Sequence, residues 1–130
     1  MEPTIPKNIK MISHVSPFDL KLTADFTQIE QTLINLIKNA IDAVSERNKG
    51  VIQLNAFSDN EGILILVEDN GTGISEELAE EIFVPFFTTK KNGSGIGLSL
   101  SKQIMKNHNG TISVNSRPGE RTLFTLKFPV

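Results

Sequence analysis

Four polar residues in the segment 27–46 could hold a metal ion and phosphate groups. Asn35, Lys38, Asn39 and Asp42 fall on one narrow stripe when the segment is drawn as a helix, opposite a broad apolar arc. Such a stripe can be an ordinary solvated helix face. However, Asn is a poor helix former, and its amide oxygen suits a hydrated Mg²⁺ that bridges phosphates. Two amides one turn apart, beside a lysine, can therefore meet a metal–phosphate group.

The stretch VEDNGTGI, residues 67–74, places a carboxylate where an apolar strand ends. Taken alone, it can be a strand followed by a glycine turn. Alternatively, Asp69 enters a pocket and accepts a hydrogen bond from an exocyclic amine. Gly71 and Gly73 would then let the backbone approach a flat ring that a Cβ would block.

A glycine cluster, GSGIGL at residues 93–98, runs directly into a segment with helical spacing. It can be a flexible loop, and the preceding Phe83, Phe86 and Phe87 can form a small satellite core. Backbone N–H groups at a helix start nevertheless make an anion site, aided by the helix dipole. The G-x-G-x-G spacing matches neither the dinucleotide fingerprint nor the P-loop, so any phosphate site here is of another kind.

Apolar periodicity predicts the elements that position these groups. Alternation predicts strands at 9–15, 18–25, 51–58, 62–69, 111–116 and 122–128. Helical spacing predicts helices at 27–46 and 96–108, and a short one capped by Ser75. Thr27 and Glu30 form a capping box that marks the start of the first helix, whereas residues 84–97 are predicted to be a long loop. Strands paired as hairpins beside helices indicate an α/β sandwich, not a parallel doubly wound fold.

Length and composition narrow the classes of function. The 130 residues fit one domain, 1–130, and the net charge of −2 gives no overall field for nucleic acid or an anionic membrane. Cysteine is absent, and no apolar run is long enough for a signal peptide core or a membrane span. We expect a cytoplasmic domain without nucleic-acid binding or membrane insertion, which holds any anionic ligand locally.

Four boxes in the chain together resemble one family. NLIKNAIDA, VEDNGTGI, IFVPFFTTK and GSGIGLSLSKQIMKNHNGTI are similar, in order and spacing, to the N, G1, F and G2 boxes of sensor histidine kinases. These boxes belong to the ATP-binding catalytic domain (HATPase_c) of the GHKL superfamily, shared with gyrase-type topoisomerases and mismatch-repair ATPases. The resemblance covers about residues 25–129. It implies a two-layer sandwich, with three helices on one face of a mixed, mostly antiparallel sheet of about five strands.

The resemblance also assigns roles to residues. Asn39 and Asn35 would face Mg²⁺ and the ATP phosphates beside Lys38 and Asp42, and Asp69 would bind the adenine amine. The catalytic set would be Asn35, Lys38, Asn39 and Lys90. Phe83, Phe86 and Phe87 would anchor the ATP lid. The other residues implied in nucleotide binding border the base or wrap the phosphates: Gly71, Gly73, Ile74, Phe87, Thr88, Thr89, Lys90, Gly93, Ser94, Gly95, Ile96, Gly97 and Leu98.

The implied function is transfer of the ATP γ-phosphoryl group to a histidine on a separate dimerisation domain of the same or a partner chain, and indirectly to a response regulator. Hydrolysing relatives commonly carry a Glu base where this chain has Asn35, and an amide cannot take a proton, which favours transfer over hydrolysis. His14 and His108 lack the phosphoacceptor context, so we expect no autophosphorylation by the isolated domain. Two alternatives remain: a GHKL-type serine kinase of an anti-sigma system, and a non-catalytic nucleotide-binding module.

Overall fold

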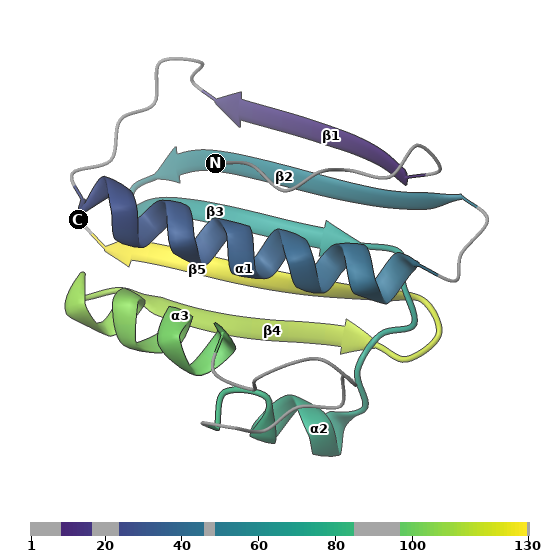
Figure 1. Ribbon diagram of the computed structural model, residues 1–130. Coiled ribbons are helices and arrows are strands. Elements are labelled where there is room, and N and C mark those ends of the chain that lie inside the picture. Colours follow the sequence, from purple (N-terminus) through teal and green to yellow (C-terminus); the bar gives the residue numbers. More distant parts are fainter. Residues whose placement is uncertain (1–8, 17–23, 46–48, 85–96, 130) are drawn as a thin grey trace.

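The computed structural model describes residues 9–16, 24–45, 49–84 and 97–129, which form one five-stranded sheet and three helices (Figure 1). The elements in chain order are β1 (Ile9–Ser16), α1 (Phe26–Val44), β2 (Gly50–Asp59), β3 (Gly62–Asp69), α2 (Glu76–Glu81), α3 (Gly97–Asn107), β4 (Thr111–Arg117) and β5 (Arg121–Pro129). The strand order is β1-β2-β3-β5-β4. β1 pairs with β2 in parallel, and the other neighbours are antiparallel, which confirms the predicted mixed sheet.

Two predicted hairpins are confirmed. In the first, β2 and β3 meet at a turn that the Asp59 carboxylate closes by accepting from the N–H groups of Glu61 at 2.8 Å and Gly62 at 3.1 Å. The second joins β4 to β5. The parallel pair β1 and β2 instead requires a crossover connection, which contains α1.

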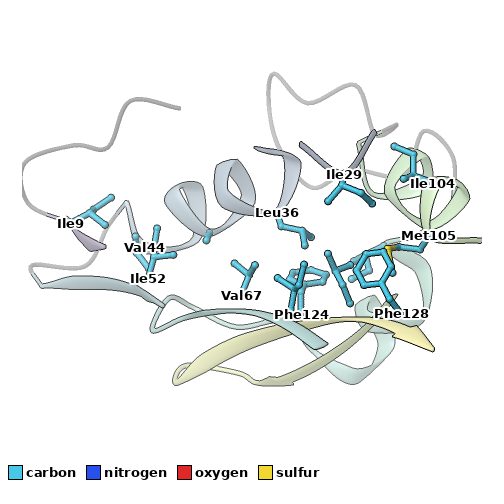
Figure 2. Close-up of a cluster of buried hydrophobic side chains, with 14 residues drawn as sticks. Ile9, Ile29, Leu36, Val44, Ile52, Val67, Ile104, Met105, Phe124 and Phe128 are labelled. Carbon is cyan, nitrogen blue, oxygen red and sulfur yellow. The ribbon is translucent and has the colours of Figure 1, made fainter. Parts of the chain in front are cut away.

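The core lies between one face of the sheet and the helices α1 and α3, which lie over that face (Figure 1). Alternate residues of the central strands point to the helices, as Ile65 and Val67 of β3 and Phe124 and Leu126 of β5 show. Leu36, Val44 and Met105 meet them from α1 and α3 (Figure 2). The short helix α2 contacts β4. None of the described helices is long and apolar enough to cross a membrane.

Helix α1 begins earlier than predicted. Its N-cap is Asp25, whose carboxylate accepts from the N–H of Gln28 at 3.0 Å, so the predicted capping box of Thr27 and Glu30 is wrong. Both Asp and Thr can cap a helix, and the two stand two residues apart. The strand predicted at 18–25 does not include Ala24 or Asp25, and its residues 18–23 lie outside the described part of the chain.

The other two helices agree with prediction. Ser75 caps α2 by accepting from the N–H of Leu78 at 3.3 Å. Helix α3 ends at Asn107, and Asn109 then takes a left-handed conformation with φ of 59°. The N–H of Gly110 donates to the Met105 carbonyl at 2.8 Å, which satisfies a carbonyl of the last turn.

Helices α1 and α3 run antiparallel and are joined at one end by His108. Its Nδ1 lies 2.8 Å from the Ile104 carbonyl, and its Nε2 accepts from the backbone N–H of Asp25 at 3.1 Å. One neutral tautomer, with the proton on Nδ1, satisfies both contacts. The ring also packs edge-on against Phe128. His108 therefore connects the end of α3 to the cap of α1.

Candidate functional site

The polar stripe of α1 is only partly open to solvent. Lys38 and Asp42 are exposed, whereas Asn35 and Asn39 are half-buried. Because residues four apart share a helix face, Asn35, Asn39 and Ala43 form one line along α1. Two other elements of the predicted site meet this line.

The first turn of α3 meets the line at Asn35. The side-chain nitrogen of Asn35 donates to the Gly97 carbonyl at 3.2 Å and lies 3.4 Å from the Ser101 hydroxyl. Its side-chain oxygen accepts from the Gln31 amide at 3.1 Å. Asn35, which is predicted to face metal and phosphate, thus also contacts Gly97, the first residue of α3.

The turn after β3 meets the line at Ala43. The N–H of Thr72 donates to the Ala43 carbonyl at 3.3 Å. A Cβ built on Gly71 would lie 2.4 Å from the same oxygen, so the backbones of the turn and of α1 are in close contact. Ala43 and Asn35 are eight residues apart, which corresponds to about 12 Å along the helix. Asn39 lies midway between the two contacts.

Asp69, the last residue of β3, is buried with 4% of its surface exposed. One carboxylate oxygen accepts from the N–H of Gly71 at 2.9 Å, and no other hydrogen bond to this side chain is found within the described residues. Burial raises the pKa of Asp69 to about 6; the nearby charge of Glu68 adds to this effect, and the Gly71 hydrogen bond opposes it. A buried carboxylate with spare accepting capacity suits a ligand N–H donor.

Hydrogen bonds hold the turn after Asp69 in place. The Asn70 side chain accepts from the N–H of Val51 at 2.8 Å and donates to the Lys49 carbonyl at 2.9 Å. The N–H of Ile74 donates to the Ser116 hydroxyl at 2.6 Å. Sequence reasoning assigned nothing to Asn70 or Ser116. A polar residue directly after a buried strand was the available signal for Asn70, but Ser116 carried none.

Gly71 and Gly73 have a structural explanation that differs from the expected approach to a ring. The space that a Cβ on Gly71 would need is filled by the Ala43 backbone. Gly73 has a φ of +74°, and its Cβ would lie 2.6 Å from the Arg117 carbonyl. Contacts within the protein therefore already require glycine at both positions, because side chains there would collide with backbone.

The structure describes part of the predicted phosphate-binding segment. Gly97 and Leu98 begin α3, and Leu98 packs against the core. Phe83 packs edge-on against the core residue Phe124, with 6.4 Å between the ring centroids, so it adjoins the main core and not a separate satellite core. The remaining predicted residues lie outside the described residues: Phe86, Phe87, Thr88, Thr89, Lys90, Gly93, Ser94, Gly95 and Ile96.

Comparison with known proteins gives the family. Residues 24–130 match the model of the histidine kinase-, DNA gyrase B- and HSP90-like ATPase family (HATPase_c). The signal transduction histidine-protein kinase AtoS of Escherichia coli is 43% identical over 122 residues, which are 92% of this chain and 20% of AtoS. The C4-dicarboxylate transport sensor protein DctB of Rhizobium meliloti is 41% identical over 82% of this chain and 17% of its own length. The chain thus spans a fifth or less of these two relatives.

A solved structure supports the same assignment. The catalytic domain of histidine kinase ThkA superposes with a TM-score of 0.83 at 37% identity, covering 94% of this chain and 79% of that one. This protein, with its sandwich, its strand order and its line of contacts along α1, is therefore similar to histidine kinases in both sequence and structure. The chain belongs to the histidine kinase-, DNA gyrase B- and HSP90-like ATPase family, and it is an ATP-binding catalytic domain of the sensor histidine kinase type.

Proposed function

We propose that the chain binds Mg-ATP along α1 and donates the γ-phosphoryl group to a histidine on a separate dimerisation domain. The observation that carries this proposal is the line on α1. The turn that follows the buried Asp69 contacts this line at Ala43, the start of α3 contacts it at Asn35, and Asn39 lies between the two contacts. An elongated ligand with a base at one end and phosphates at the other matches that order.

Asp69 would take the adenine end. Its spare carboxylate oxygen can accept from an exocyclic amine, and its burial excludes water that would compete for that bond. Gly73 and Ile74 belong to the same turn, held by the bond from Ile74 to Ser116. They would border the base together with Gly71.

Asn39 would take the metal end. The described residues contain no group of three or more His, Asp or Glu side chains that could hold a metal. A single amide oxygen, with water and substrate phosphates, is a donor set that suits Mg²⁺. When bound, Mg²⁺ supplies neutralisation of charge on the phosphates. Lys38 and Asp42 stand exposed beside Asn39, and Gly97 and Leu98 would adjoin the phosphates. For Lys90 and the other residues named above between Phe87 and Ile96, we propose the nucleotide-binding roles that the family resemblance implies.

Transfer to a partner, rather than hydrolysis, is supported by the side chains near the phosphate end. Asn35 offers no proton acceptor there, so this chain would position the γ-phosphoryl group while the partner supplies the nucleophile. Both ring nitrogens of His108 have partners within the chain, so this histidine is not proposed as the phosphoryl acceptor.

The related kinase ThkA has been crystallised in complex with the response regulator TrrA. We extend that to a cytoplasmic response regulator as the final acceptor here.

Phosphoryl transfer from labelled ATP tests this function. The chain would be mixed with Mg²⁺ and purified histidine-containing domains of related kinases such as AtoS and ThkA. We expect acid-labile, alkali-stable label on the acceptor, lost in Asn39→Ala and retained in Gln103→Ala, a change on the exposed side of α3. Acid-stable label would indicate a serine kinase, and ATP binding without label on any acceptor would indicate a non-catalytic module.

A further inference from the structure

The orientation of the Asn35 side chain is fixed by its partners. The Gly97 carbonyl can only accept a hydrogen bond, so the atom 3.2 Å from it must be the amide nitrogen. The amide oxygen, which is the atom able to bind Mg²⁺, therefore accepts from Gln31, one turn toward the start of α1. Asn39 lies one turn the other way.

Ser101 completes the contact between the helices. Its side chain is fully buried, and its hydroxyl donates to the same Gly97 carbonyl at 2.9 Å. The Asn35 nitrogen lies 3.4 Å from that hydroxyl. Three polar groups from two helices thus meet at the residue that begins α3. The bond from Asn35 to Gly97 spans 62 positions in the sequence and is a tertiary contact.

We propose that Asn35 is a positioning residue that holds the first turn of α3 against α1, and that it is not a metal ligand. The metal role then belongs to Asn39 alone of the two amides. This inference rests on the proposed function only in taking the start of α3 to be the phosphate end of the site. It follows that Asn35 acts on phosphate binding through Gly97, whether or not a metal is present.

Titration calorimetry with three ligands separates the possible roles. Wild type, Asn35→Ala, Asn39→Ala and Ser101→Ala would be titrated with ATP in Mg²⁺, with ATP in EDTA, and with adenosine. Ser101→Ala removes the partner hydroxyl without touching α1, so it tests the same contact if Asn35→Ala does not fold. Gln103→Ala is the matched control, because it removes an exposed hydrogen bond of α3 that does not involve α1.

We expect Asn35→Ala to bind ATP about three- to tenfold more weakly than wild type, by the same factor in Mg²⁺ and in EDTA, the range for one or two lost hydrogen bonds. Ser101→Ala should show a smaller loss of the same pattern, and adenosine affinity should stay unchanged in both. Asn39→Ala should lose affinity only in Mg²⁺.

Three results would overturn the inference: a loss in Asn35→Ala that is confined to Mg²⁺, an equal loss for adenosine and ATP, or no loss in either Asn35→Ala or Ser101→Ala. The first would make Asn35 a metal ligand, and the second would make its role one of general folding. The titrations measure binding alone. A wild-type chain that bound ATP but transferred no phosphoryl group would refute the proposed function and leave this inference standing.

Discussion

The burial of Asp69 suits ligand binding, but it lowers the stability of the fold once the carboxylate is charged. The side chain is 4% exposed and has one hydrogen bond, from Gly71, among the described residues. Its pKa of about 6 lies above the ordinary value of 3.8, because burial penalises the charged form. Between these two pH values the folded chain holds a proton that the unfolded chain has lost. Stability from this group is therefore present at acid pH and falls as the pH rises toward 6.

We predict that Asp69→Asn changes the pH dependence of folding. The charge penalty is about 3 kcal/mol above pH 7 and about 0.5 kcal/mol at pH 4, at about 1.4 kcal/mol per pKa unit. Relative to wild type, the variant should gain about 2.5 kcal/mol as the pH rises from 4 to 8, although its unpaired amide N–H lowers its stability at all pH values. Urea unfolding at several pH values measures this, and parallel curves for the two proteins would contradict it.

At the scale of the elements, α1 and the turn after β3 are in close backbone contact. We predict that Gly71→Ala lowers the free energy of unfolding by about 3 kcal/mol, because the added Cβ would meet the Ala43 carbonyl at 2.4 Å and neither backbone can yield easily. Gly119→Ala is the matched control. Gly119 has a φ of +81° but nothing within 4 Å of its Cβ position, so it should cost only about 1 kcal/mol of backbone strain. Denaturant unfolding of both variants checks the difference, and an equal loss would mean that the contact is loose.

His108 makes a second prediction at this scale. His108→Ala removes the bonds to Asp25 and Ile104 and the contact with Phe128, and we expect a loss of about 2 kcal/mol. His14→Ala, on the exposed surface of β1, should change stability by less than about 0.5 kcal/mol. Thermal unfolding of the two variants would refute the connection between α1 and α3 if their midpoints shifted equally.

Local sequence patterns predicted most elements but not all their ends. The hairpin around Asp59 and Gly62 was predictable, because alternating strands flank a turn-forming segment. The start of α1 was misplaced, because Asp25 and Thr27 are both good caps and the choice depends on what surrounds them. His108 satisfies the backbone N–H of Asp25 from 83 positions away, and no local pattern reports such a partner.

At the scale of the whole molecule, the candidate site depends on contacts between distant segments. Family resemblance pointed to Asn35, Asn39 and Asp69, but only the folded chain places the turn at Ala43 and the start of α3 on one face of α1. The sequence could not predict that Gly71 is required by the α1 backbone, or that Asn35 faces Gly97. Both facts arise from packing across more than 25 positions of sequence.

The central claim is that adenine binds at the Asp69 end of this line and the phosphates at the Gly97 end. Backbone amide chemical shifts recorded while ligand is added test it most directly. Adenosine should shift the signals of Gly71 and Ile74 and leave that of Gly97 unchanged, whereas Mg-ATP should shift all three together with Asn39. Adenosine shifts at Gly97 without shifts at Gly71, or Mg-ATP shifts away from α1, would contradict the account.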